Sequence, residues 1–71
     1  GTGAAEDKAQ AFAWYEKAAK QGLSKSQFNL GVLYRDGLGV AQNMKAAKSW
    51  FEKAAAQGDE EAAAELADWS E

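Results

Sequence analysis

Cysteine and histidine are both absent from this 71-residue chain. Their absence excludes disulfide frameworks and the usual zinc clusters, which small domains often need for stability. A chain of this length buries only about 60% of the surface that it exposes when unfolded, so we expect a single domain of low stability. Oligomerisation or contact with neighbouring repeats is the remaining support. Because a chain without cysteine suits reducing and oxidising compartments alike, its localisation stays open.

Long apolar runs are also missing. No run approaches the roughly eighteen apolar residues of a membrane span, so membrane insertion is not expected. Gly1-Thr2-Gly3 lacks the basic and apolar blocks of a signal peptide. Residues 1–4 are therefore predicted to be disordered or a cloning remnant.

Positive charge is absent from the end of the chain. Residues 1–58 hold eight Lys or Arg against five Asp or Glu, whereas residues 59–71 hold six acids and no base. The net charge is −3, and the C-terminal end is expected to be an acidic surface. Since nothing provides the basic stripe that phosphate backbones require, nucleic acid is not an expected partner.

What the chain does contain is an internal repeat. Residues 14–22 read Trp-Tyr-Glu-Lys-Ala-Ala-Lys-Gln-Gly, and residues 50–58 read Trp-Phe-Glu-Lys-Ala-Ala-Ala-Gln-Gly, at an offset of 36 residues. A fixed period in this range is typical of a helical solenoid, in which each unit buries its apolar face against its neighbours. Such an architecture points to binding rather than catalysis.

Four helices are predicted, over about 5–21, 24–35, 43–57 and 59–69. The first and third share an apolar stripe at helical spacing, which includes Trp14 and Tyr15 in one copy and Trp50 and Phe51 in the other. The two tryptophans hold the same position in the repeat, so both are expected in the core, each spanning the gap between one helix pair and the next.

Local signals mark the helix ends. Gly22 and Gly58 stand where a left-handed C-cap is wanted, because glycine takes positive φ without a steric cost. Asn43 and Asp59 are good N-caps. Residues 24–27, Ser-Lys-Ser-Gln, read as a capping box at the start of the second helix.

Glycines inside and after the second helix carry further predictions. Gly31 costs about 1 kcal/mol relative to alanine in mid-helix, so we expect close contact with another helix there. Residues 36–42, Asp-Gly-Leu-Gly-Val-Ala-Gln, are predicted to be a loop, with Leu38 and Val40 covering the core beneath it.

An enzyme is not indicated. Gly37-Leu38-Gly39 lacks the Gly-Lys-Ser/Thr of a P-loop, and it lacks the strand and third glycine of a dinucleotide site. The acids of residues 59–68 share one short helix that faces water rather than lining a cleft. Ser24 and Ser26 have no histidine to act as a base. No catalytic, metal or cofactor site is therefore expected.

At this point the residues resemble the Sel1-like repeats, relatives of the tetratricopeptide repeats with a unit of this length. The family pattern is matched by Leu30-Gly31, Tyr34, Gly37, Gly39-Val40, Asn43, Lys45-Ala46, Trp50-Phe51, Lys53-Ala54-Ala55 and Gly58. Ser26 and Asn43 replace the Ala and Asp that are usual in the family, and Leu23 departs more clearly because its equivalent is the N-cap Asp59.

The resemblance predicts how the chain divides. Residues 5–22 correspond to the second helix of one repeat, 23–58 to a complete repeat and 59–71 to the first helix of a terminal repeat. The last helix departs from the pattern, with Ala67 for Gly31, Asp68 for Val32, Trp69 for Leu33 and Ser70 for Tyr34. Because terminal repeats are usually atypical, this helix is a candidate C-terminal cap.

The resemblance implies an all-α, short right-handed solenoid of antiparallel helix-turn-helix repeats that serves as a non-catalytic scaffold for a protein or peptide partner. In related superhelical folds the first helix of each pair lines the concave groove. The candidate partner-binding residues on that surface are Lys25, Asn29, Val32, Arg35, Glu61, Glu65, Asp68 and Trp69. The alternative is a solenoid cap or a dimerisation element, with a homodimer formed through the exposed end helices.

Overall fold

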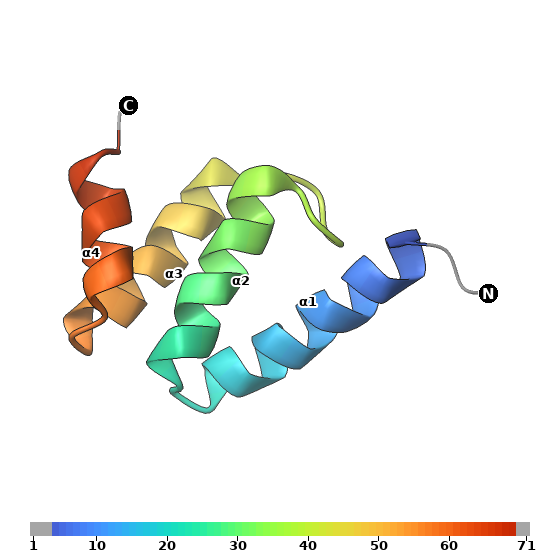
Figure 1. The fold of residues 1–71 in the computed structure, drawn as a ribbon, viewed down its shortest axis with the longest axis horizontal. Helices are drawn as coiled ribbons and strands as arrows, with labels where there is room; N and C mark the ends of the chain where they lie inside the picture. Colours follow the sequence, from blue (N-terminus) through green and yellow to red (C-terminus); the bar gives the residue numbers. More distant parts are fainter. Residues whose placement is uncertain (1–3, 70–71) are drawn as a thin grey trace.

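The computed structural model describes residues 4–69, with side chains from residue 8 onward. These residues form four helices and no strand: α1 (Ala4–Lys20), α2 (Ser24–Asp36), α3 (Met44–Ala56) and α4 (Glu60–Ala67). Each helix packs against the next one in the chain, and α1 and α4 lie at the two ends of the array (Figure 1). The protein is thus an all-α helical-repeat solenoid. The predictions for residues 1–3 and 70–71 lie outside the described part.

The predicted caps of α3 and α4 are confirmed. The Asn43 side chain accepts a 3.0 Å hydrogen bond from the Ala46 N–H, and the Asp59 side chain accepts one of 2.9 Å from the Ala62 N–H. Both residues therefore stand just outside their helices. α4 ends at Ala67, two residues earlier than predicted.

The predicted capping box of α2 is wrong. The N-cap is Leu23, whose side chain makes no capping bond, and Ser24 is already the first helical residue. The Leu23 N–H bonds the Ala18 carbonyl, and the Gln27 N–H bonds the Leu23 carbonyl. The tight turn after α1 therefore sets the start of α2, and the Ser24 hydroxyl lies too far along the helix to cap it.

The core lies between α2, α3 and α4. Its central cluster of buried residues is Ala47, Phe51, Ala54 and Ala62, and Leu30 on α2 and Ala19 on α1 are buried as well. Two aromatic rings pack on Phe51, with centroid distances of 5.5 Å to Phe28 and 5.9 Å to Trp69.

Gly31 confirms the expected close approach of two helices. A Cβ built on this glycine would lie 2.8 Å from the Phe51 ring. Any side chain at residue 31 would therefore push α2 and α3 apart.

Gly39 makes the second close approach. Its φ is +76°, and a Cβ at this position would overlap the backbone carbonyl of Lys8 on α1. The loop between α2 and α3 thus rests directly on the α1 backbone, while Leu38 and Val40 are half-buried. Glycine is required here by both conformation and space.

The prediction that both repeat tryptophans are core residues is wrong for Trp14, which is 71% exposed. Trp50 is half-buried, and the Lys53 amine lies 4.3 Å from the centroid of its ring. The two positions differ because α3 packs against α2 on one side and α4 on the other, whereas α1 packs mainly against α2. Identical repeat positions therefore have unlike surroundings.

Gln27, which the sequence assigned to the capping box of α2, is buried at 6% exposure. Its amide donates to the Ala19 carbonyl at 3.2 Å, and its oxygen accepts from the Gln57 side chain at 2.9 Å. A buried amide needs such partners. Gln27 therefore joins the ends of α1 and α3 to α2.

Candidate partner-binding surface

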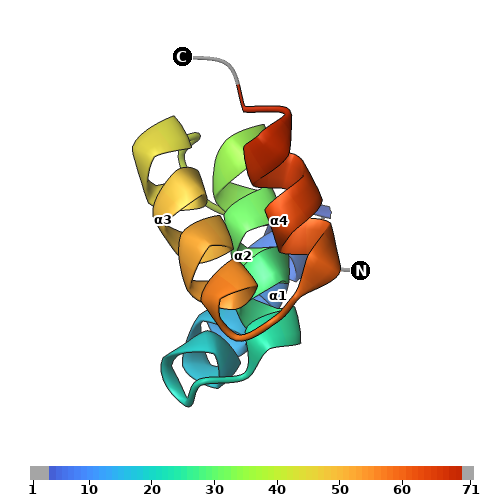
Figure 2. The same cartoon turned by 90° about the vertical axis from the view of Figure 1, so that its left-hand side faces the viewer.

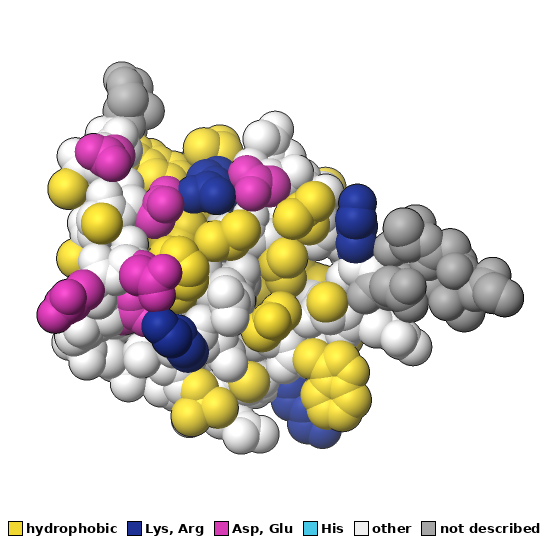
Figure 3. All heavy atoms as spheres, in the orientation of Figure 1, with side chains coloured by type: hydrophobic (Ala, Val, Ile, Leu, Met, Phe, Trp, Pro, Cys, Tyr) yellow, Lys and Arg dark blue, Asp and Glu magenta, His cyan; other side chains and the backbone are white. Residues whose placement is uncertain are grey.

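The candidate partner-binding residues lie on α2, on α4 and just after α4, and two ion pairs connect these helices. Lys25 Nζ lies 2.9 Å from Glu61 Oε1, and Arg35 pairs with Glu65. Lys25 and Glu61 occupy the same repeat position, so the stacking of one repeat on the next places opposite charges side by side. Figure 3 shows this face, where basic side chains lie beside acidic ones over α2 and α4. Both cations of the predicted set are thus paired within it.

Arg35 is held most firmly. Its guanidinium also pairs with Asp36 at 3.1 Å and lies 6.0 Å from the centroid of the Phe51 ring. The pKa of Arg35 is raised above its ordinary value, mainly by the hydrogen bond to Asp36. The hydrogen bond to Glu65 raises it further, whereas partial burial lowers it. A charged group with this many partners holds α2 and α4 together more than it offers a free contact.

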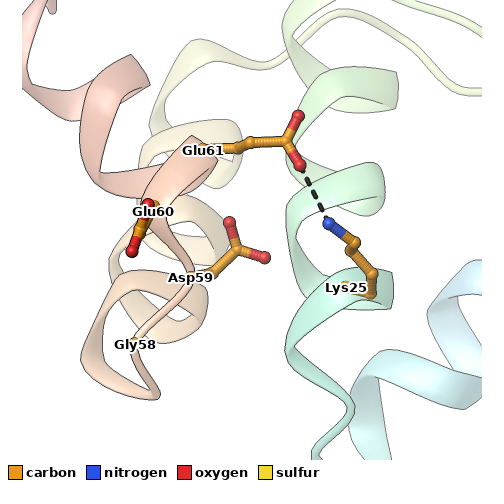
Figure 4. Close-up of a pocket in the computed structure, with 5 residues that line it drawn as sticks. All are labelled: Lys25, Gly58, Asp59, Glu60 and Glu61. Carbon is orange, nitrogen blue, oxygen red and sulfur yellow. Dashed lines mark hydrogen bonds and ion pairs between the residues drawn. The ribbon is translucent and has the colours of Figure 1, made fainter.

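Lys25 is exposed and lies at the other end of the surface, beside the turn between α3 and α4. The pKa of Lys25 is raised above its ordinary value. The hydrogen bond to Glu61 is the largest cause, and the negative charges of Glu61 and Asp59 add to it. In Figure 4, Lys25 points toward Glu61, while Glu60 points away from the pair. These side chains, with Gly58, line an open hollow of about 340 Å³.

Between the two ion pairs α2 presents Asn29 and Val32, which are one helical turn apart. Asn29 is half-exposed, and its side-chain amide has no hydrogen-bond partner among the described residues. Val32 is half-buried and packs on the core beneath it. The strip therefore combines a free donor and acceptor with a small apolar contact.

The remaining candidates lie at the end of α4. Asp68 is exposed, and its backbone N–H caps the helix by bonding Ala64 and Leu66 carbonyls. Trp69 is half-buried, with its ring edge-on to Phe51. The Asp68 side chain is available to a partner, whereas the Trp69 ring already packs against Phe51 in the core.

The described side chains assemble no other chemistry on this surface. Among them, no three acids, cysteines or histidines come close enough to hold a metal ion, and no buried polar atom lacks a partner. No helix within residues 4–69 is long and apolar enough to cross a bilayer.

One feature that the sequence analysis missed lies at the opposite end of the molecule. Trp14, with Gln10, Ala13 and Lys17, lines a hollow of about 490 Å³ on the outer side of α1. The available signal was the position of α1 within the repeat pattern, as a second helix without the first helix of its pair. The number of helices that flank α1 and α3 predicts the exposure of Trp14, whereas the residues of the two helices do not.

Comparison with known proteins places the chain among helical repeats. The sequence model of one family, described as Sel1 repeat, matches residues 1–23 and 24–59. The crystal structure of a Sel1 repeat protein from Oxalobacter formigenes superimposes with a TM-score of 0.86 and is 48% identical in sequence, over 87% of this chain and 47% of that one. The chain therefore spans about half the length of that protein. No curated protein matches the chain.

Proposed function

The chain belongs to the Sel1 repeat family, whose members generally mediate protein–protein interactions, and on that premise we propose that it is a non-catalytic scaffold. The partner is a protein or peptide, and it binds the surface that α2 and α4 form together. This surface is called the α2–α4 strip below and comprises Lys25, Asn29, Val32, Arg35, Glu61, Glu65, Asp68 and Trp69.

The free amide of Asn29 is the observation that supports this proposal best. It lies half-exposed between two ion pairs that hold α2 and α4 in place. A peptide that lies against helices finds no free backbone edge, so side chains must satisfy its N–H and C=O groups. An asparagine supplies both a donor and an acceptor, and Val32 adds an apolar contact one turn away.

Affinity capture with matched variants tests this proposal. The test variant combines Lys25→Ala, Asn29→Ala and Asp68→Ala, and leaves out Arg35 and Val32 because both support the core. The control variant combines Lys45→Ala, Ser49→Ala and Glu52→Ala, three exposed residues of similar types on α3. Both are used as bait in extracts of cells that contain the native protein.

We expect at least one protein to be retained by the wild type and the control variant and lost, by about tenfold or more, with the test variant. A tenfold change corresponds to about 1.4 kcal/mol, which is within the range for a few interface contacts. Equal retention by all three baits would reject the α2–α4 strip as the binding surface.

The exposure of Trp14 favours a second candidate from another class, an element that joins copies of the chain. A large aromatic side chain that is 71% exposed is more typical of an interface than of a free surface.

A further inference from the structure

Gln27 is the only buried polar side chain among residues 8–69. Its two hydrogen bonds lead to different helices. The amide nitrogen donates to the Ala19 carbonyl on α1 at 3.2 Å, and the oxygen accepts from the Gln57 amide at the end of α3 at 2.9 Å. Because α1 and α3 share few contacts and each packs against α2, this side chain is a polar connection between two helices that otherwise meet mainly through α2.

The helix ends that these bonds join lie together at one edge of the molecule. Figures 1 and 2 show the end of α1, the start of α2 and the end of α3 in the lower part of both views. Ala19 belongs to the last turn of α1, where carbonyl groups lack donors within the helix. The Ala19 carbonyl accepts from the Gly22 N–H at 3.0 Å and from Gln27, so both of its lone pairs are used.

Apolar packing places the end of α1 only loosely. Ala19 is the one buried residue of α1 from residue 8 onward, and an alanine methyl interdigitates little with a neighbouring helix. The edge-on contact of Phe12 with Tyr34 lies about two turns earlier. A buried amide is more exacting, because an amide that loses its partner keeps the full cost of leaving water. Gln27 therefore disfavours every other register of the α1 end on α2.

We propose that Gln27 is a lock that couples α3 to α1. The Gln57 side chain holds the oxygen of the Gln27 amide, and this amide is one flat group that carries the acceptor and the donors together. A partner that fixes the oxygen thus also fixes the nitrogen, which is placed against the Ala19 carbonyl. A change at Gln57, after α3, is then transmitted to the last turns of α1.

The lock also fixes the direction of the partner-binding side of α2. Residues two apart on a helix point about 200° apart, so an inward Gln27 turns Lys25 and Asn29 outward. Lys25 is exposed and Asn29 is half-exposed. Gln27 is thus a positioning residue for the α2–α4 strip, and this consequence alone rests on the proposed function.

Amide hydrogen exchange in the folded chain, followed by NMR, tests the lock. Gln57→Ala removes an exposed side chain and leaves Gln27 and Ala19 in place. We expect amides of residues 14–20 to exchange about tenfold faster than in the wild type, and those of residues 44–53 to change by less than about threefold, since local openings are independent of global unfolding. Glu52→Ala, which removes another exposed side chain on α3, is the matched control and should leave α1 unchanged.

A second variant shows whether the effect travels through Gln27. Gln27→Leu removes both bonds and keeps a side chain of similar size that needs no partner. It should keep the helical circular dichroism of the wild type, and residues 14–20 should exchange at least as fast as in Gln57→Ala. Adding Gln57→Ala to Gln27→Leu should have no further effect on α1, because the connection is already lost.

Three results would overturn the proposal: exchange in α1 that Gln57→Ala leaves unchanged, equal acceleration in all four helices, or effects of the two substitutions that add. If Gln27→Leu does not fold, the comparison of Gln57→Ala with Glu52→Ala decides alone. Because no partner takes part in these measurements, failure of the lock would leave the proposed function untouched.

Discussion

The distance between α2 and α3 is set by one residue, Gly31. The Phe51 ring fills the space where a side chain would begin, with 2.8 Å between the ring and an added Cβ. Glycine in a helix interior lowers helix stability by about 1 kcal/mol relative to alanine. The loss is offset by burial of a phenylalanine side chain, which is worth roughly 1.5–3 kcal/mol.

Replacing Gly31 with alanine should therefore destabilise the protein, although alanine is the better helix former. We expect the free energy of unfolding to fall by about 1–3 kcal/mol, the usual cost of an overpacked core, as measured by urea denaturation. In a Phe51→Leu background the same substitution should cost less, because the ring that it meets is gone. A Gly31→Ala protein that is more stable than the wild type would show that the helices have room to spare.

At the scale of the elements, similar sequence signals have different outcomes at the helix ends. Asn43 and Asp59 cap their helices, but the Ser24 signal is not used because the turn after α1 places Leu23 at the N-cap. Which residue becomes the cap depends on how the preceding turn closes.

This difference predicts unequal effects of two alanine substitutions. Asn43→Ala should lower the free energy of unfolding by about 1 kcal/mol, the typical value for a lost N-cap. Ser24→Ala should change it by less than about 0.5 kcal/mol, as for an ordinary surface position. Thermal and urea unfolding of both variants would check this, and a larger loss at Ser24 would mean that its hydroxyl does cap α2.

The loop between α2 and α3 makes a second prediction, through Gly39. Gly39→Ala and Gly22→Ala both place a side chain at positive φ, which costs about 1–2 kcal/mol. Only Gly39 would also collide with α1, at the Lys8 carbonyl, since nothing lies within 4 Å of an added Cβ at Gly22. The Gly39 variant should therefore be the less stable by at least about 1 kcal/mol in urea denaturation. Equal losses would place the loop further from α1.

Local patterns were sufficient for the existence and order of the four helices, for two of the three N-caps and for the role of Gly31. They failed where the answer depends on neighbours. Gln27 was assigned to a capping box, but it is buried and bonds the Ala19 carbonyl and the Gln57 side chain. The sequence also identified the charges of the α2–α4 strip without their pairing, which follows from how one repeat stacks on the next.

The contrast between Trp14 and Trp50 makes the same point most clearly. Both tryptophans occupy the same position of the repeat. The repeat sequences alone therefore do not predict that Trp14 is exposed and Trp50 half-buried. Their burial differs because α3 has a helix on each side and α1 does not.

For the molecule as a whole, this arrangement separates two surfaces. The array measures 39 × 27 × 15 Å, with α1 and α4 at its ends. The hollow beside Trp14 lies on α1, while the α2–α4 strip lies where α2 and α4 are joined by ion pairs.

The most direct measurement is the mapping of backbone amide chemical shifts on the 71-residue chain with and without a captured partner. We expect the largest changes at Asn29 and Val32 on α2 and at Asp68 after α4, with little change at Lys45, Ser49 and Glu52 on α3. Changes centred on those three residues of α3, or on α1 around Trp14, would contradict binding at the α2–α4 strip.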